Sequence, residues 1–176
     1  DLYNRLDTTA QANETTDPAY APDGTLDTQT DGKGVITDYS YDALKRLTQA
    51  VQDQGGADPT TANATTGYGY DSADRLTSVT DPVNGNTTYV YDDLGNLLSQ
   101  TSPDSGTTTF TYDSAGNLKT RKDAKAQQFT YSYDVLNRPT LADGPSTADD
   151  ISYSYDLCTN GVGRLCSMTR VSETAS

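Results

Sequence analysis

The sequence predicts an all-β protein, an array of antiparallel β-hairpins of about 21 residues each that forms a curved or spiralling sheet. The first observation is a Tyr-Asp pair that returns along the chain in steps of 29, 21, 21, 21 and 22 residues. The second is the alternation ahead of each pair, as in Thr88-Tyr89-Val90-Tyr91, which is the two-residue period of a strand. The third is the turn chemistry that follows, as in Asp92-Asp93-Leu94-Gly95. The pairs are Tyr41-Asp42, Tyr70-Asp71, Tyr91-Asp92, Tyr112-Asp113, Tyr133-Asp134 and Tyr155-Asp156.

The composition taken alone favours intrinsic disorder. Leu, Ile, Val and Phe together supply 26 of 176 residues, and the net charge is -13, which is the profile of chains that cannot bury enough apolar surface. Against disorder, 11 of the 13 tyrosines occupy matched positions in the repeated phrase. We therefore interpret the tyrosines as the apolar supply of an ordered but thin, one-layer sheet.

Charge and residue content exclude several classes of function. The 12 basic residues are dispersed in an acidic chain, so neither nucleic acid nor insertion into a membrane is expected. Without any histidine, the chain cannot supply a Ser-His-Asp or Cys-His mechanism. The acidic residues lie in turns and show no calcium-loop spacing. We expect no enzymatic activity, catalytic residue, cofactor or metal site.

The chain is expected to be a single array over residues 1–176. Residues 1–6 match the part of a copy that follows its tyrosine, so the chain starts inside a truncated repeat, as an excised piece would. Residues 7–34, which include a short strand near Thr25 to Thr28, and residues 54–66 are expected to be insertion loops. The complete repeats are expected at 35–53, 67–86, 87–107, 108–128, 129–150 and 151–170.

Each residue type of the phrase has an expected structural role. Tyrosines at i and i+2 share one face of a strand, so they form an aromatic ladder. The aspartate accepts the backbone N–H two residues further on, and glycine tolerates the unusual backbone angles at the end of the turn. The predicted structural repeat residues are Tyr39, Tyr41, Asp42, Tyr68, Tyr70, Asp71, Tyr89, Tyr91, Asp92, Gly95, Tyr112, Asp113, Gly116, Tyr131, Tyr133, Asp134, Tyr153, Tyr155 and Asp156.

Two further positions follow the turn. An arginine, such as Arg46, could pair with the repeat aspartate or with the backbone of the next hairpin. The leucine after it, such as Leu47, is the expected packing partner of the tyrosines. Pro139 replaces this leucine in one copy and predicts a locally distorted or edge strand.

The two cysteines, Cys158 and Cys166, flank an enlarged turn in the last repeat. We favour a disulfide across this hairpin, and two free thiols are the alternative. A zinc site is not expected, because the chain has no histidine and no second cysteine pair.

The phrase Tyr-x-Tyr-Asp-x-x-Gly-Asn/Arg-Leu at a period near 21 resembles the RHS (YD) repeat. The resemblance covers roughly Val35 to Met168, with residues 1–6 as a truncated copy. It implies hairpins that spiral into a large hollow shell. In bacterial RHS polymorphic toxins and in the C component of insecticidal toxin complexes, such a shell encloses a toxic domain, and teneurins use a similar shell in cell adhesion. Many bacterial members cleave themselves near Asp-Pro motifs, but the Asp-Pro pairs here lie in loops and turns, so no catalytic residue is carried over.

The resemblance leads to two hypotheses for function. The first is a non-enzymatic structural scaffold, a segment of an exported bacterial RHS shell that encloses a toxin or cargo domain. The alternative is an extracellular adhesive or filament-forming protein that assembles through its edge strands and binds carbohydrate on the tyrosine face. The expected partners are further RHS repeats of the same or neighbouring chains, an encapsulated toxin domain and glycans. The expected location is the bacterial cell surface or the secreted fraction.

Overall fold

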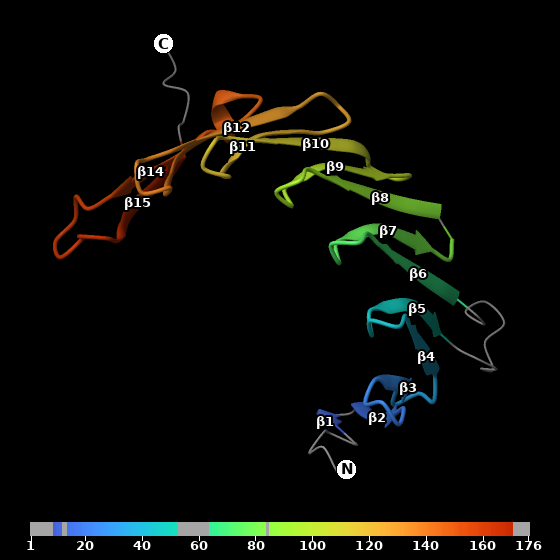
Figure 1. Cartoon of the computed structure of the whole chain (residues 1–176). Helices are drawn as coiled ribbons and strands as arrows, with labels where there is room; N and C mark the ends of the chain where they lie inside the picture. Colours follow the sequence, from blue (N-terminus) through green and yellow to red (C-terminus); the bar gives the residue numbers. More distant parts are fainter. Residues whose placement is uncertain (1–8, 12–13, 53–63, 84, 171–176) are drawn as a thin grey trace. The chain divides into compact units, whose positions relative to one another are not determined.

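The computed structural model describes residues 9–11, 14–52, 64–83 and 85–170. These residues fall into two compact units, and the boundary in the sequence lies between Thr88 and Tyr89. The described elements are β-strands, apart from the short 3-10 helix η1 (Thr147–Asp149). Figure 1 labels the strands, which follow one another in chain order.

The described residues of the first unit form seven strands and the start of an eighth. Each strand pairs antiparallel with the next strand in the sequence. The strands are β1 (Thr9–Gln11), β2 (Glu14–Tyr20), β3 (Leu26–Thr30), β4 (Ile36–Tyr41), β5 (Leu47–Gln52), β6 (Ala64–Tyr70), β7 (Leu76–Asp81) and β8 (Gly85–Tyr91).

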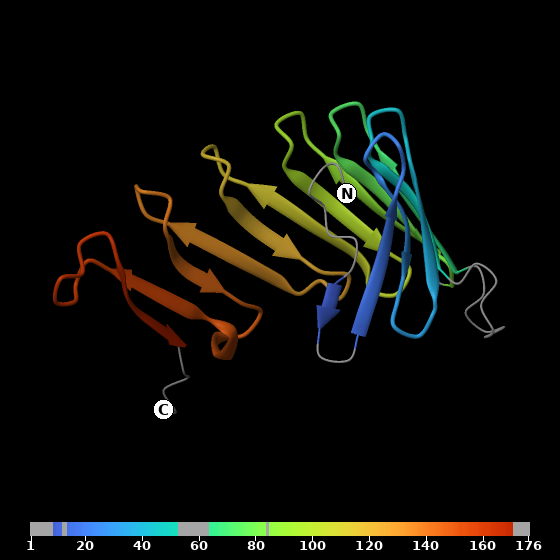
Figure 2. The ribbon, with the colours of Figure 1, turned by 90° about the horizontal axis from the view of Figure 1, so that it is seen from below.

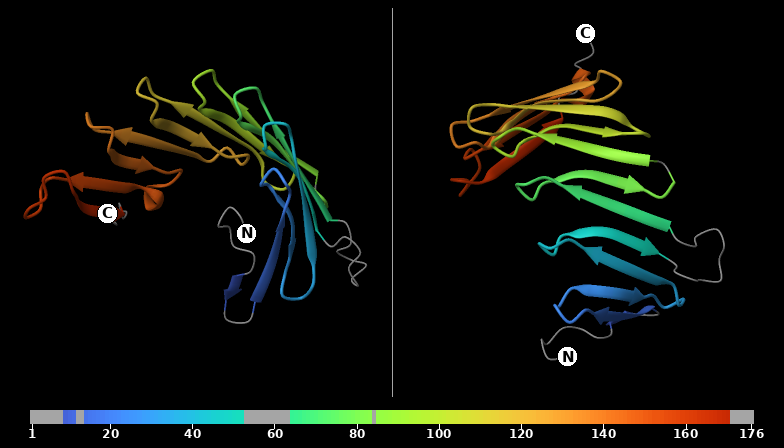
Figure 3. Two further views of the ribbon diagram at one scale, coloured as in Figure 1. Left: turned by 60° about the horizontal axis from the view of Figure 1, so that its bottom comes forward. Right: turned by 45° about the vertical axis from the view of Figure 1, so that its right-hand side comes forward.

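The second unit continues the same pattern from the end of β8. Its strands also pair antiparallel with their sequence neighbours, and Figures 2 and 3 show the strands of each unit lying side by side in a single layer. The all-β hairpin array is thereby confirmed as an unclosed antiparallel arrangement. The strands are β9 (Leu97–Ser102), β10 (Gly106–Tyr112), β11 (Leu118–Lys122), β12 (Gln128–Tyr133), β13 (Pro139–Asp143), β14 (Ile151–Tyr155) and β15 (Leu165–Arg170).

The described residues form no hydrophobic core, since none of their hydrophobic side chains is buried. The tyrosines of the phrase are half-buried, whereas the residues between them, such as Ser40 and Thr111, are mostly exposed. Val90 at one of these positions keeps 53% of its surface accessible. One face of the sheet thus carries the partly covered aromatic rings and the other faces solvent, as expected for a single layer.

A β-bulge recurs in the hairpins just before the second tyrosine. In β4–β5, Ser40 pairs with Gln49 but Tyr41 pairs with Leu47, so Thr48 is the extra residue. The same shift occurs in the hairpins formed by β2–β3, β6–β7, β10–β11, β12–β13 and β14–β15. Because a bulge is a local change of register, its repetition gives each of these hairpins the same geometry beside the turn.

The expectation of an insertion loop over residues 7–34 is wrong. Strands β2 and β3 form a further hairpin in which Tyr20 pairs with Leu26, as Tyr41 pairs with Leu47 elsewhere. Its turn has Ala21 where the other copies have aspartate, and the backbone N–H of Ala21 donates to Thr25 O at 2.9 Å. The Asp23 carboxylate accepts from the N–H and hydroxyl of Thr25 instead, so the turn is stabilised without the usual aspartate.

Two other expectations concern residues outside the described ranges. The truncated copy at residues 1–6 lies there, and so do residues 54–63 of the second insertion. The last residues assigned to that insertion, 64–66, belong to β6 and pair with β5.

Pro139 does not mark an edge strand. It is the first residue of β13, which pairs with β12 on one side and β14 on the other. Proline is tolerated at the first position of a strand, where its missing N–H removes little of the hydrogen-bond ladder. In the described residues, no helix is long and apolar enough to cross a membrane.

Candidate functional site

The repeated turn is the most elaborate local structure in the chain. In the turn that starts at Asp113, the backbone N–H of Gly116 donates to Asp113 O and that of Asp113 donates to Asn117 O. One carboxylate oxygen, Oδ1, accepts the N–H groups of Ala115 and Asn117, both at 2.9 Å. A side chain at the start of the turn therefore binds two backbone groups that no strand partner can reach. The same set of bonds surrounds Asp31, Asp42, Asp71, Asp92, Asp123 and Asp134.

The second carboxylate oxygen binds the side chain at the fifth turn position. Arg46 Nε donates to Asp42 Oδ2 at 2.7 Å, and Asn96 Nδ2 donates to Asp92 Oδ2 at 2.8 Å. Arginine and asparagine thus satisfy the same acceptor with different donors. Either residue can therefore occupy the fifth position of the turn.

The fourth turn position has a left-handed backbone. The φ angles are 89° at Gly95 and 83° at Gly116, but also 63° at Lys45, 62° at Asp74 and 59° at Asn137. A side chain with a Cβ is strained at such angles. The turn's hydrogen bonds therefore outweigh the strain in the copies that lack glycine.

Arg46 and Arg138 of the phrase also join their own hairpin to the next one. Arg46 Nη1 donates to Asp71 O at 3.0 Å and lies 2.6 Å from the Asp74 carboxylate, while its guanidinium covers the Tyr70 ring at 4.9 Å from the centroid. Of the two predicted roles, pairing with the aspartate and contact with the next hairpin, Arg46 has both. Ion pairs and cation–π contacts at partly exposed positions are individually weak. Here they act together on the same contact between two successive hairpins, which we call a joint.

Arg138 makes the equivalent joint in the second unit. Its Nη2 lies 2.6 Å from Asp134 Oδ2 in its own turn and 2.9 Å from Asp156 Oδ2 in the next. Its guanidinium lies 4.3 Å from the centroid of the Tyr155 ring. Both arginines thus contact the aspartate of their own turn, an acidic side chain of the next turn and a tyrosine ring, although the acidic residue is Asp74, the fourth of its turn, for Arg46 and Asp156, the first of its turn, for Arg138.

Tyr112 and Tyr133, the second tyrosines of their hairpins, bond the preceding hairpin through their hydroxyl groups. Tyr112 donates to Leu97 O at 3.0 Å, and Tyr133 donates to Leu118 O at 2.9 Å. Each acceptor is the carbonyl of the leucine that follows the previous turn. The aromatic ladder is therefore also a series of side-chain to backbone hydrogen bonds, which the sequence did not indicate.

The electrostatics of the turns favour charged aspartates and neutral tyrosines. The backbone N–H of Arg46 is the main cause that lowers the pKa of Asp42, and the Asn117 side-chain amide has this role at Asp113. Burial is the main cause that raises the pKa values of Tyr112 and Tyr133. A hydrogen bond to a charged carboxylate stabilises the charge, whereas partial burial penalises a phenolate.

The last described turn differs from the others. Cys158 and Cys166 form a disulfide with a Cα–Cα distance of 5.4 Å. Asp156 begins this turn, but its carboxylate accepts from Arg138 of the preceding hairpin and from the Gly163 N–H. The disulfide thus spans a turn whose aspartate bonds differently from the aspartates of the shorter turns.

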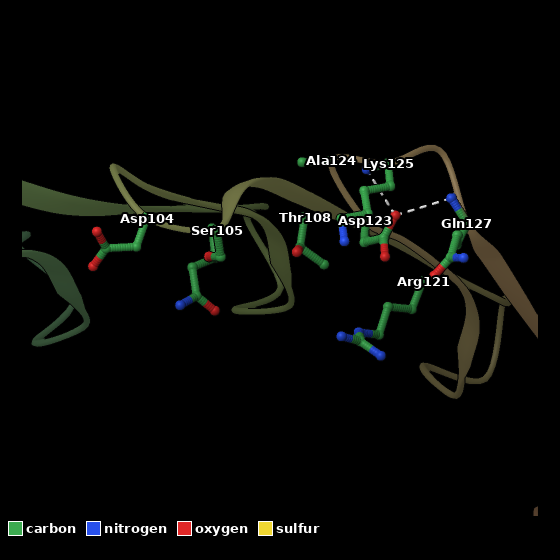
Figure 4. A pocket seen from close by; sticks show the side chains of 9 residues that line it. Asp104, Ser105, Thr108, Arg121, Asp123, Ala124, Lys125 and Gln127 are labelled. Atoms are coloured by element: carbon green, nitrogen blue, oxygen red, sulfur yellow. Dashed lines mark hydrogen bonds between the residues drawn. The ribbon is translucent and has the colours of Figure 1, made fainter.

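An open depression of about 550 Å³ lies in the second unit. Figure 4 shows its lining, which includes Asp104, Thr108, Arg121 and Asp123. The Asp123 carboxylate is already bonded to the N–H groups of its own turn, and the Arg121 guanidinium lies 5.9 Å from the centroid of the Phe129 ring. The Asp123 and Arg121 side chains are thus engaged in holding the sheet.

A second open depression, of about 390 Å³, lies in the first unit on the tyrosine face. Tyr39 and Tyr68, the first tyrosines of two hairpins, line it together with Thr37, Thr66 and Pro82. Among the described residues, no group of three or more His, Cys, Asp or Glu side chains could hold a metal ion.

The structure places the predicted repeat residues consistently along the two units. The second tyrosines end the first strand of their hairpins, and the aspartates begin the turns. Sequence reasoning missed Tyr20, which ends β2 in the same way. A signal was available, because Tyr20 lies 21 residues before Tyr41 and six before Leu26, as Tyr41 lies six before Leu47.

Comparison with known proteins gives a family and a fold. Residues 70–107, 91–128 and 112–149 match the RHS repeat family in three overlapping copies. No curated protein compared with the chain matches it. The chain is similar to one in the structure of the Photorhabdus luminescens Tc holotoxin pore, with a TM-score of 0.63 and 21% identity over 81% of this chain and 8% of that one.

It is also similar to a chain in the crystal structure of TcdB2-TccC3-TEV, with a TM-score of 0.58 and 15% identity over 92% of this chain and 10% of that one. At these identities the likeness concerns the fold. The chain thus spans no more than a tenth of the length of these solved chains. The hairpin period and the contacts between hairpins agree with the family match, and residues 70–149 match the RHS repeat family.

Proposed function

We propose that this chain is a non-enzymatic wall segment of an exported shell that encloses a toxin or other cargo domain. The observation that carries the proposal is a sheet one layer thick, without a buried hydrophobic side chain in its described residues. A domain that works alone normally buries one face of its sheet. A sheet that contacts water or cargo on both faces is suited to separate two spaces.

Three further observations support the proposal. The solved chains with a similar fold belong to a Tc holotoxin pore and to a TcdB2-TccC3 assembly. The Cys158–Cys166 disulfide suits an oxidising environment outside the cytoplasm. The polar groups of the repeated turns bind one another and the backbone, which gives them a structural role.

Limited proteolysis of the complete gene product tests the proposal. Its repeats and non-repeat segments are separated by mass spectrometry after timed digestion, before and after mild denaturation. We expect the cargo domain to resist protease until the repeats unfold, and electron microscopy to show a closed hollow particle. Cargo that is digested equally fast in both conditions would contradict an enclosing shell.

The second candidate is an extracellular adhesive that binds glycans on the tyrosine face. The depression bordered by Tyr39 and Tyr68 favours it, because aromatic rings beside hydroxyl groups can stack on sugar rings. On a glycan array, binding that is lost in Tyr68→Ala but kept in Tyr131→Ala would support adhesion. No binding by the wild-type chain would reject it.

A further inference from the structure

The chain contains two Asn-Gly pairs, Asn84-Gly85 and Asn160-Gly161. In such a pair the backbone nitrogen of the glycine can attack the side-chain amide carbon of the asparagine, because glycine has no side chain that hinders the approach. The reaction closes a succinimide ring and releases ammonia, and water then opens the ring to aspartate or isoaspartate. Asn160 lies inside the enlarged turn that the disulfide closes, whereas Asn84 lies outside the described residues.

The enlarged turn binds the nitrogen that would have to react at Asn160. The Gly161 N–H donates to Cys158 O at 2.8 Å, and Gly161 O accepts from the Arg164 N–H at 2.8 Å. Gly161 is buried, although the residues on either side of it, Asn160 and Val162, are exposed. Attack requires the nitrogen to lose its proton to a base in solvent, and a buried, hydrogen-bonded N–H is protected from that loss. The turn therefore restrains the nucleophile.

The Asn160 side chain is not restrained in the same way. It is exposed, and within the described residues its amide has no hydrogen-bond partner. Its backbone has a φ of 57°, a left-handed conformation that asparagine adopts more readily than most residues. The glycine nitrogen is thus the reacting group that the turn controls.

The disulfide covers Gly161 and fixes the carbonyl that binds it. A Cβ added at Gly161 would lie 2.6 Å from Cys158 Sγ and 2.8 Å from Cys166 Sγ, closer than real Cβ atoms come. The acceptor Cys158 O belongs to one of the bonded cysteines, and the Cys158 N–H donates to Cys166 Sγ at 3.0 Å. Cutting the bond removes the constraint that keeps both cysteines against the glycine. Protection of the Gly161 nitrogen is therefore linked to the oxidised state.

We propose that Asn160 is a self-modification site and that the Cys158–Cys166 disulfide controls its deamidation. With the disulfide intact, the Gly161 N–H stays bound and the asparagine persists. A thiol reductant supplies two electrons and two protons, which convert the disulfide into two thiols and release the turn.

The reaction then proceeds with solvent alone. The Gly161 nitrogen gives its proton to a base in solvent and bonds to Asn160 Cγ, and the bond from Cγ to the side-chain nitrogen breaks as ammonia leaves. Water adds to the succinimide and opens it. The net change is the loss of ammonia and the gain of water, so this stage needs neither an oxidant nor a reductant.

The product differs from the starting turn in charge and in length. Aspartate or isoaspartate adds a negative charge to an acidic chain, and isoaspartate adds a carbon atom to the backbone between the cysteines. Neither change is undone when the cysteines are oxidised again. The site therefore records that the chain has entered a reducing compartment such as the cytoplasm. This chemistry depends on the turn alone, not on the wall function or on glycan binding.

Peptide mapping by mass spectrometry tests the proposal on the full chain, incubated in mildly alkaline buffer with or without dithiothreitol. Alkylation of free thiols reports the state of the disulfide in each sample. We expect the reductant to accelerate deamidation of Asn160 about tenfold. Asn84 is the internal control, because its Asn-Gly pair lies far from the cysteines in the sequence, and its rate should change by less than about twofold.

Two variants separate the effect of the disulfide from the general stability of the hairpin. Cys158→Ala combined with Cys166→Ala should deamidate at Asn160 as fast without reductant as the reduced wild type does. Arg138→Ala keeps the disulfide but removes the contact of Arg138 with Asp156, the first residue of this turn. It should change the rate in the oxidised chain by less than about threefold.

Four results would overturn the proposal. The first is an Asn160 rate that the reductant does not change, including no deamidation in either sample. The second is equal acceleration at Asn84 and Asn160, which would assign the effect to the solution rather than to the turn. The third is acceleration by Arg138→Ala equal to that by the reductant, since the stability of the hairpin would then protect the site. The fourth is a double cysteine variant that deamidates as slowly as the oxidised wild type.

Discussion

Replacing Tyr112 by phenylalanine removes one hydroxyl from the joint between two hairpins and leaves the ring in place. The hydroxyl donates to Leu97 O at 3.0 Å from a half-buried position. A neutral hydrogen bond of this kind contributes about 0.5 to 1.5 kcal/mol net. Tyr89→Phe is the matched control, because within the described residues the Tyr89 hydroxyl has no hydrogen-bond partner, and its expected effect is below about 0.5 kcal/mol.

Native-state hydrogen exchange is the suitable assay, since a repeat array need not unfold in one step. For Tyr112→Phe, we expect amides of β9 and β10 to exchange about 2- to 12-fold faster, with little change in β14 and β15. Equal effects of Tyr112→Phe and Tyr89→Phe, or an effect spread evenly over the second unit, would refute the role assigned to the hydroxyl.

The same pair of variants has a defined dependence on pH. Burial raises the pKa of Tyr112 above its ordinary value of 10.0, so its contribution is fully present below pH 10 and is lost as the pH rises through the raised pKa. A phenolate cannot donate to Leu97 O. The difference in exchange rate between wild type and Tyr112→Phe should therefore shrink in alkaline solution, and a constant difference would contradict this reasoning.

Three further predictions concern the turns. Gly116 has a φ of 83° and open space around it, so Gly116→Ala should lower the free energy of unfolding by about 1 kcal/mol. Ala126 has a φ of 63°, so Ala126→Gly should raise the free energy of unfolding by a comparable amount. A denaturant titration measures both changes, and a change of the same sign in the two variants would count against backbone strain. The pKa of Asp113 lies below its ordinary value of 3.8, so the stability that its carboxylate contributes is present above pH 3.8 and is lost as the pH falls through the lowered pKa. The free energy of unfolding of the second unit should therefore fall in acid, and it should fall less steeply for Asp113→Asn. Equal acid dependence of wild type and Asp113→Asn in a denaturant titration at several pH values would disprove the contribution. The Cys158–Cys166 disulfide closes a short loop, so its reduction should destabilise β14–β15 by about 2 kcal/mol without affecting β9–β11. Hydrogen exchange measured with and without reductant tests this prediction. Unchanged exchange in β14–β15 would show that the disulfide does not stabilise the hairpin.

Local features of the fold were predictable from the sequence because their causes are local. The alternation around Tyr89 and Tyr91 indicates a strand, and the aspartate that follows indicates a turn. The bonds from the Asp42 carboxylate to Leu44 and Arg46 span two and four residues. Interactions of this range can be read from a short stretch of sequence.

Interactions between hairpins were not predictable in the same way. Arg46 meets Asp74 across 28 residues, and Tyr112 meets Leu97 across 15. Both contacts depend on the register between neighbouring hairpins, which the bulges and turns set in three dimensions. The hairpin at Tyr20 was not predicted for a different reason, since this copy has Ala21 in place of the aspartate of the Tyr-Asp pair.

The composition indicates disorder because the usual criterion treats aliphatic side chains as the main source of stability. This chain satisfies that criterion for disorder and yet forms regular strands without a buried core in its described residues. Its tyrosines contribute both ring area and a hydroxyl donor. Its turn aspartates accept hydrogen bonds from backbone N–H groups of the turns. The hydroxyl bonds of the tyrosines exist only when neighbouring hairpins are in place, so this part of the stability is a property of the contacts between hairpins.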